Sequence, residues 1–355
     1  MAQKNFLRAI VLFIGLSTLT SFISIPKAQA WGKRGHSIVC QTAAYLASDA
    51  PKGEFLKAHS FDLGYYCNVP DLIWKQPETY QLEWFNHFMD MEIFDREIPA
   101  TEREKAFAMD RLPFNAAYPQ IPDKAGRSFW RIRELLADGQ NLLQQLQKTG
   151  ITVEEKHKLQ ADWLIHAGAM GHYVGDLCQP LHVTENYDGQ MSGQKGVHVW
   201  FEDLVVDELF QGMGPSLESE VMKAAQSKFK KLAILQSKES PLERLITLAN
   251  QSNDDLKTLL AIDKKVGRKD LKKAARAYHD MIVDRMASGA VVLAGLWGRE
   301  IGWDYDGNKF YSFVGSPAYL AAPRAAAVNT PQTPFTAEKP KAVSAPVAPA
   351  DPTAP

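Results

Sequence analysis

The sequence predicts an all-α protein, a single and mostly helical domain with irregular segments on its surface. Apolar residues recur along most of the chain at the spacing of amphipathic or buried helices. The alternation of apolar and polar residues that is typical of strands is scarce. The chain has 355 residues, of which 45% are hydrophobic, and this is enough apolar material for a substantial core.

Helical periodicity is concentrated in a series of separate segments. In chain order these are residues 37–47, 128–147, 153–175, 197–210, 217–235, 242–262 and 271–297. Prolines recur through residues 61–122, so we expect that stretch to form irregular surface segments packed on the helices. The sequence contains no internal repeat.

The N-terminal end has the pattern of a signal peptide. Lys4 and Arg8 precede an apolar run, and Ala28-Gln29-Ala30 supplies the small residues of a cleavage site before Trp31. The alternative is an uncleaved membrane anchor, but Ser, Thr and Pro interrupt the run. No later stretch approaches eighteen uninterrupted apolar residues, so we expect a soluble mature chain, either periplasmic or secreted.

The C-terminal end is rich in proline. Nine of the twenty prolines lie between Pro317 and Pro355, among Ala, Thr, Val and Lys residues. Such a segment cannot bury enough apolar surface to fold, so residues 316–355 are predicted to be an extended, disordered tail. The folded domain would then comprise residues 31–315.

Charge and cysteine content exclude several classes of protein. The 40 Lys and Arg residues are balanced by 41 Asp and Glu residues, so the chain lacks the basic excess of a protein that coats nucleic acid. Cys40, Cys67 and Cys178 are too few for a disulfide scaffold and lack the spacing of a structural zinc site. At most one disulfide can form, and an exported protein tolerates a bridge between Cys40 and Cys67.

Two groups of histidines and carboxylates have metal-ligand spacing. His172 and Asp176 lie four residues apart on a predicted helix, and Pro180 ends that helix so that His182 can return to the same point. His198 and Glu202 repeat the four-residue spacing on the next predicted helix. Neutral imidazole nitrogens and carboxylate oxygens suit zinc.

Each pair alone is also compatible with a core histidine or an ordinary surface pair. Both pairs together, with His182 between them, favour a metal site. His166 lies off the face of His172, so we place it in the core or behind the ligands. Cys178 is turned away from the same face and is predicted to be a buried free thiol.

Five short motifs in order along the chain resemble the trinuclear zinc site of the superfamily of S1/P1 nucleases and zinc-dependent phospholipases C. The motifs are Trp31-Gly-Lys-Arg-Gly-His36, Asp71, Trp84-Phe-Asn-His87-Phe-Met-Asp90, His172-x3-Asp176-x5-His182 and His198-x3-Glu202. They cover residues 31–209, and the remaining helices fit the superfamily by class. The resemblance implies a helical domain of the phospholipase C/P1 nuclease type with three zinc ions per chain.

The resemblance also implies the ligands of each ion. One zinc would be held by Asp71, His87, His172 and Asp176, and a second by His182, His198 and Glu202. The third would take the α-amino nitrogen and carbonyl oxygen of Trp31 together with His36, with Asp176 bridging it to the first. Because the amine of Trp31 exists only after the signal peptide is cut, export and activation would be coupled.

Such a centre predicts hydrolysis of a phosphodiester. Its positive charge would attract phosphate to a chain without a basic excess, and water shared between the ions would become the nucleophile. Asp71 is our candidate to orient or deprotonate that water. No Ser or Cys nucleophile is required.

The nuclease interpretation is favoured over the phospholipase alternative. The short spacing between Trp31 and His36 is that of the nucleases. In nucleases the residues at the places of Phe88 and Asp90 stack on a base and bind its edge, but phospholipases carry a similar motif, so this motif alone does not discriminate. Stacking contributes about 1–3 kcal/mol per base and tolerates any base, so we expect a weakly specific enzyme whose substrate partner is single-stranded DNA or RNA. Arg34 stands where choline-preferring phospholipases carry an acid, which weakens a choline pocket.

Two features differ from the usual nuclease pattern. Nucleases usually carry a basic residue three positions after the first aspartate, and here Trp74 takes that place with Lys75 beside it as the candidate for phosphate binding. Glu202, in place of aspartate, is the choice of the phospholipases, and this keeps membrane phospholipid as the alternative substrate. A third alternative is a zinc-binding homologue without catalytic activity.

Overall fold

Two long helices, α9 (Val153–Leu177) and α14 (Leu271–Glu300), supply much of the buried centre of the protein. The computed structural model describes residues 31–50, 53–76, 79–212 and 215–300, and within these ranges it contains helices and no β-sheet. An isolated β-bridge pairs Met89 with Gly126. The predicted all-α, mostly helical domain is confirmed.

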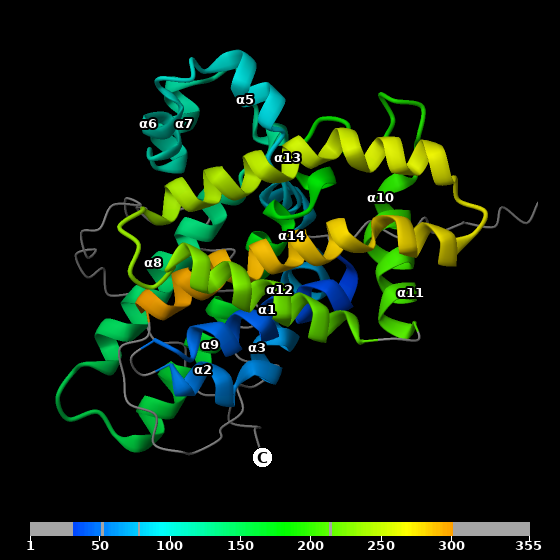
Figure 1. Cartoon of the computed structure of the whole chain (residues 1–355). Coiled ribbons are helices and arrows are strands. Elements are labelled where there is room, and N and C mark those ends of the chain that lie inside the picture. The colour runs from blue at the N-terminus through cyan, green and yellow to red at the C-terminus, as the bar shows by residue number, and fades with distance from the viewer. Residues whose placement is uncertain (1–30, 51–52, 77–78, 213–214, 301–355) are drawn as a thin grey trace, which may run out of the picture.

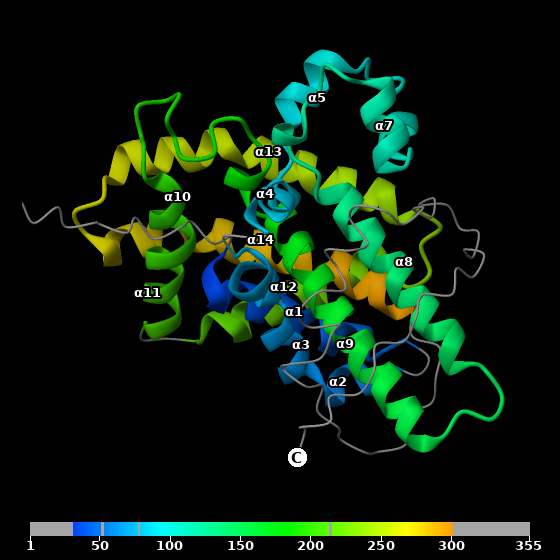
Figure 2. The same cartoon turned by 180° about the vertical axis from the view of Figure 1, so that it is seen from behind.

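The other long helices pack around these two (Figure 1). Helix α14 contacts α1 (Gly32–Ala47), α12 (Leu217–Leu232) and α13 (Pro241–Val266), whereas α9 contacts α8 (Ser128–Leu146). Figure 2 shows from behind that α8 and α9 form a pair at one side of the molecule. Apolar side chains from all of these helices form one continuous core.

Side-chain caps fix where two of the long helices begin. Thr152 precedes α9 and Ser240 precedes α13, and each hydroxyl accepts a hydrogen bond from the backbone N–H three residues further on. The glutamate at that third position accepts a hydrogen bond from the backbone N–H of the cap residue, so N–H groups without helical partners are satisfied. Each cap contributes about 1 kcal/mol to stability.

The predicted helices are present, with their ends displaced by a few residues. Helix α1 begins at Gly32, before the predicted start at residue 37. The predicted helix 197–210 consists of three consecutive pieces, namely α10 (Val197–Val199), the π-helical turn η5 (Trp200–Val205) and α11 (Val206–Gln211).

Helix α14 is long and apolar enough to cross a membrane by length and composition alone. Within the described residues this holds for Leu271–Gly298, in which an 18-residue window has a mean hydropathy of 1.3. In the structure 72% of the window is buried, because α1, α12 and α13 cover it. It is therefore a core helix of this domain.

The proline-rich stretch 61–122 is more regular than its composition predicts. It contains a series of short helices and turns, since proline can begin a helix but prevents a long one. These elements are α3 (Ser60–Tyr66), which follows α2 (Glu54–Ala58), then η1 (Pro70–Trp74), α4 (Tyr80–Glu83), η2 (Trp84–His87), α5 (Met91–Glu97), α6 (Arg103–Phe107) and α7 (Arg111–Ala117), followed by η3 (Asp123–Ala125).

A disulfide joins Cys40 of α1 to Cys67 at the end of α3. Helix α9 packs closely on it, because a Cβ atom at Gly171 would lie 2.3 Å from Cys40 Sγ. Cys178 is a buried free thiol, as predicted. The predicted signal peptide, the end of the predicted domain from residue 301 and the predicted tail lie outside the described residues.

Candidate metal centre

Helix α9 carries two polar side chains into the buried centre of the domain. His172 and Asp176 lie one turn apart, and His172 Nε2 is 3.6 Å from Asp176 Oδ2. After α9 ends, the 3-10 turn η4 (Pro180–His182) brings His182 back, so that its Nδ1 lies 3.9 Å from Asp176 Oδ1. The structure thus brings together the three residues that the sequence pattern singled out.

His198 and Glu202 lie where α10 passes into the π-helical turn η5. Such turns are rare and often occur at functional sites. His198 Nε2 is 2.9 Å from Glu202 Oε2 and 3.0 Å from His182 Nε2. The two ligand-type segments therefore meet, with His182 between them.

Helix α1 supplies His36, and Trp31 precedes that helix. His36 stacks on His172 with ring centroids 3.9 Å apart, and its Nε2 is 3.5 Å from Asp176 Oδ1. The buried indole of Trp31 donates from Nε1 to the carbonyl of Gly175, 2.8 Å away. Trp31 also lines a cavity of about 400 Å³ together with Glu202.

Asp71 and His87 complete the centre from the proline-rich stretch. Asp71 lies in η1, a second π-helical turn, and His87 ends η2. His87 Nδ1 is 3.7 Å from Asp71 Oδ1, 3.3 Å from Asp176 Oδ2 and 3.0 Å from His172 Nε2.

These side chains form three neighbouring groups, of which two share His172, and the ligand-type atoms within each group lie within 4.8 Å of one another. The groups are His36, His172 and Asp176; Asp71, His87 and His172; and His182, His198 and Glu202. Every side chain predicted as a ligand belongs to one of them. The remaining predicted ligand, Trp31, would contribute backbone atoms.

Backbone carbonyls orient three of the imidazoles. The Nδ1 atoms of His172, His182 and His198 each lie 2.7 Å from a carbonyl oxygen, of Cys67, His87 and Tyr187 respectively. A donor Nδ1–H leaves Nε2 unprotonated, which is the tautomer that binds a metal ion. In all three residues Nε2 faces the centre.

Several buried polar atoms of the centre have no hydrogen-bond partner in the described structure. They are both ring nitrogens of His36, both carboxylate oxygens of Asp176 and Oε1 of Glu202. Buried polar atoms are costly unless they are hydrogen-bonded or coordinate a metal. Because zinc takes nitrogen and oxygen donors of these types, the residues fit the ions predicted from the sequence.

Burial sets the protonation of the centre. It lowers the pKa of His36, His87 and His172 well below the ordinary value, so these imidazoles are neutral and available as ligands. Burial also raises the pKa of Asp176 well above its ordinary value, and the Asp71 carboxylate adds to that rise. A cation between these groups would relieve the repulsion of the carboxylates.

The predicted base-binding residues lie beside the centre. The segment after His87 is extended, and Met89 N–H donates to the His182 carbonyl at 2.9 Å. Because side chains alternate in an extended segment, Met89 is buried whereas Phe88 and Asp90 on the other side are half-buried. The Phe88 ring packs on Trp84 with centroids 5.3 Å apart.

Lys75 lies against the centre. Its Nζ donates to Asp71 Oδ1 at 3.1 Å. Burial lowers the pKa of Lys75, but the Asp71 carboxylate outweighs burial, so the pKa is raised and the ammonium is charged. The side chain of Trp74, by contrast, is fully buried in the core.

Sequence reasoning assigned no role at the site to Gln179. In the structure its Nε2 donates to Glu202 Oε2 at 2.9 Å, and the side chain is completely buried. Gln179 therefore orients a predicted ligand. Its position beside Pro180 gave no signal of that role.

Cys178 stays outside the groups of ligand-type atoms, and its Sγ accepts a hydrogen bond from the Trp31 indole at 3.2 Å. Burial raises the pKa of this thiol to about 12, so it remains protonated. We therefore expect Cys178→Ser to keep the zinc content and the activity of the wild type. Elemental analysis showing one zinc ion fewer per chain in this variant would contradict the assignment.

His166 has no ligand-type neighbours of this kind. It is buried on α9, and burial lowers its pKa to about 4, so it is a neutral core histidine.

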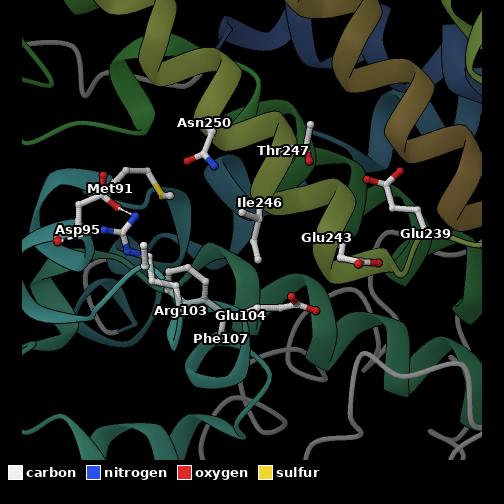
Figure 3. A pocket seen from close by; sticks show the side chains of 11 residues that line it. Met91, Asp95, Arg103, Glu104, Phe107, Glu239, Glu243, Ile246, Thr247 and Asn250 are labelled. Carbon is white, nitrogen blue, oxygen red and sulfur yellow. Dashed lines mark hydrogen bonds and ion pairs between the residues drawn. The ribbon is translucent and has the colours of Figure 1, made fainter.

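The structure also contains a cavity of about 380 Å³ between α5, α6 and α13, where Asp95 and Arg103 form an ion pair at 2.6 Å (Figure 3). None of the predicted site residues lines that cavity.

Comparison with known proteins adds an evolutionary relationship to this geometry. No family model matches the chain. The chain is 22% identical to Endonuclease 1 of Arabidopsis thaliana over 227 residues, a match that covers 59% of this chain and 64% of the plant protein. Among solved structures, an alpha-toxin from an avian strain of Clostridium perfringens matches with a TM-score of 0.43 and 18% identity, covering 78% of this chain and 66% of the toxin.

The His, Asp and Glu groups could hold metal ions within the helical domain. By this match the chain is a distant homologue of the plant endonuclease, and it spans less than two thirds of that protein's length.

Proposed function

We propose that this protein is an exported zinc-dependent nuclease that hydrolyses phosphodiester bonds in single-stranded DNA and RNA with little sequence specificity. The observation that carries the proposal is the position of Asp176, which lies within 3.9 Å of a histidine from each of the three ligand groups, in a chain homologous to an endonuclease. Removal of residues 1–30 would free the amine of Trp31 and complete the centre.

Three zinc ions would be held by the residues brought together here. One ion would be held by Asp71, His87, His172 and Asp176, and another by His182, His198 and Glu202. The third would be held by Trp31 and His36, with Asp176 shared. When bound, zinc supplies positive charge that attracts a phosphodiester and lowers the pKa of nearby water to about 7.

The chain's own residues orient the reactants. Asp71 lies at the edge of the centre, where its carboxylate can accept a proton from the attacking water. Lys75 holds Asp71 in place by its hydrogen bond and contributes positive charge toward a phosphate. The backbone carbonyl of His87 orients the His182 ring. His87 therefore serves one ion with its own imidazole and orients a ligand of a second ion with its backbone.

Phe88 and Asp90 would bind the nucleobase. The half-buried ring of Phe88 offers a face for stacking, which any base can use. The Asp90 carboxyl lies on the same side of the extended segment and can bind a base edge. This pairing supports a nuclease with little base preference.

A phospholipase C activity is the second candidate, because Glu202 matches the phospholipase pattern. The surroundings of Arg34 argue against a choline substrate. Its guanidinium pairs with Asp207 at 2.7 Å and lies over the Phe210 ring at 4.1 Å, beside the cavity that Trp31 lines. At that position a quaternary ammonium would meet the Arg34 cation, and the Asp207 carboxylate beside it is already paired.

The experiment that tests the proposal is a paired hydrolysis assay on the purified chain that begins at Trp31. One series contains single-stranded DNA or RNA and the other contains phosphatidylcholine vesicles, each with and without a zinc chelator. We expect chelator-sensitive release of nucleotides, absence of that activity in His182→Ala, and wild-type activity in His279→Ala. His279 is the matched control because it pairs with Glu220 and Asp280, far from the centre in sequence.

Each other outcome has a definite meaning. Lipid cleavage without nucleotide release would transfer the protein to the phospholipase branch. Bound zinc without hydrolysis of either ester would leave a metal-binding homologue without catalytic activity.

The ionisation of Asp90 predicts a pH dependence for base binding. Burial, reinforced by Glu92 and Glu185, raises the pKa of Asp90 to about 7. Above that pH the carboxylate can accept hydrogen bonds from the N–H groups of guanine, whereas below it the protonated carboxyl cannot accept both. We therefore expect KM for guanine-containing oligonucleotides to fall as pH rises from about 6 to 8.

Asp90→Asn is the control for this pH dependence, because an amide does not titrate in that range. Steady-state kinetics should show the change of KM in the wild type and its loss in the variant. The same KM profile in both proteins would show that Asp90 does not bind the base.

A further inference from the structure

His87 is oriented differently from the other histidines of the metal centre. His172, His182 and His198 turn Nε2 toward the centre and anchor Nδ1 on a backbone carbonyl. His87 instead turns Nδ1 toward the centre, where it lies 3.3 Å from Asp176 Oδ2. Its Nε2 points away, and no carbonyl accepts from that atom in the described structure.

A buried carboxylate lies behind His87. Glu83, one turn earlier on α4, places Oε1 3.9 Å from His87 Nε2, and its side chain is 1% exposed. That separation is longer than a hydrogen bond, so the imidazole must rotate before the two atoms can form one. Glu83 therefore stands at the place that backbone carbonyls occupy for the other three histidines.

Three other side chains hold the Glu83 carboxylate in place. The Tyr173 hydroxyl donates to Oε1, and Asn86 Nδ2 donates to Oε2 at 3.2 Å. Arg131 Nη2 lies 3.4 Å from Oε2. Burial raises the pKa of Glu83, whereas the Arg131 guanidinium and the hydrogen bonds from Tyr173 and Asn86 oppose that rise.

The contacts continue into a closed buried network. Arg131 Nη1 pairs with Glu134 at 3.1 Å, Glu134 pairs with Arg111 at 2.9 Å, and Arg111 donates to Asn86 Oδ1 at 3.0 Å. A buried polar network fixes the positions of its side chains when each polar group has its hydrogen-bond partners. Here the network joins α8 and α9 to the segment that carries His87.

We propose that Glu83 is a positioning residue that accepts the Nε2–H of His87 and so fixes the tautomer whose Nδ1 lone pair faces the centre. The proposal rests on the proposed function only in that the centre binds zinc. A carboxylate behind a ligand histidine orients the ring and raises its basicity, and loss of such a partner typically weakens metal binding about 10- to 100-fold.

The test uses Glu83→Gln and Glu83→Ala in the purified zinc-loaded protein. Competition with a chromophoric chelator measures zinc affinity, and ¹⁵N NMR of labelled histidines reports the tautomer of His87. We expect about 10- to 100-fold weaker binding of one ion per chain and a shift of His87 away from the Nε2–H form. A Glu83 variant that altered only the packing would not change the tautomer of His87.

The matched control is Glu134→Gln, which alters the same buried network without facing His87. It should keep the wild-type tautomer of His87. If the Glu83 variants do not fold, Tyr173→Phe provides the test, because it removes one hydrogen bond to Glu83 and should shift the tautomer in the same direction. Wild-type zinc affinity and tautomer in the Glu83 variants, or in Tyr173→Phe where only it folds, would overturn the proposal.

Failure of the proposed function is distinguishable from failure of this inference. A wild-type protein that binds no zinc would contradict the proposed function, yet its metal-free NMR spectrum would still report the tautomer of His87. A wild type that binds zinc with Glu83 variants of unchanged affinity and tautomer would contradict only the role of Glu83.

Discussion

Replacement of Asp176 by asparagine is expected to abolish hydrolysis and to remove more than one zinc ion from each chain. Asp176 is fully buried, and its two oxygens lie 3.3–3.9 Å from ring nitrogens of His36, His87, His172 and His182. An amide supplies one neutral oxygen where a carboxylate could bridge two ions. We expect kcat/KM to fall by more than about 100-fold, beyond the loss typical of an outer partner. Steady-state kinetics and elemental analysis measure both effects.

The same variant should lose its stability response to chelation. Zinc that binds only the folded wild type stabilises it, by about 2.7 kcal/mol when free zinc is 100 times Kd. A chelator should therefore lower the Tm of the wild type much more than that of Asp176→Asn. Without metal, the variant should be at least as stable as the wild type, because it no longer buries a carboxyl group whose ionisation is opposed by burial and by Asp71. Equal chelator sensitivity of the two proteins would contradict the assignment of Asp176.

Removal of the Cys40–Cys67 disulfide is expected to produce the largest loss of stability. In the double variant Cys40→Ala/Cys67→Ala, the free energy of unfolding should fall by about 2–4 kcal/mol, because the bridge restricts the unfolded chain. Zinc affinity should also fall, since the carbonyl of Cys67 accepts from His172 at 2.7 Å and holds that ring in place. Denaturant unfolding and chelator competition test these two consequences.

Cys178→Ser is the matched control for the disulfide, because it changes a buried cysteine that closes no loop. Its free energy of unfolding should change less than that of the double variant. A double variant with wild-type stability and zinc affinity would show that the bridge supports neither the fold nor His172.

The predictable part of the centre consists of ligands close together in sequence. His172 and Asp176 form a pair because a helix repeats its face every turn, and Pro180 must end the helix and redirect His182. The long helices were predictable for the same reason, since each buries one continuous apolar face. Asp71 and His87 have no such local signal, and only the resemblance to a superfamily connected them with α9.

The parts that sequence reasoning missed depend on contacts between distant segments. The two π-helical turns that carry Asp71 and Glu202 leave no distinct spacing in the sequence. Gln179 acts on Glu202 across the end of α9, and Glu83 is held by side chains from α8 and α9. Such partners are set by how helices pack, so residue spacing along the chain does not reveal them.

The metal content of the purified chain that begins at Trp31 tests the central claim most directly. Elemental analysis after dialysis against metal-free buffer is predicted to give close to three zinc ions per chain in the wild type, fewer in His182→Ala and in Asp176→Asn, and an unchanged number in His279→Ala. A folded wild-type protein that retains no zinc, or variants that retain the full wild-type number, would contradict the assignment of these residues as a zinc centre.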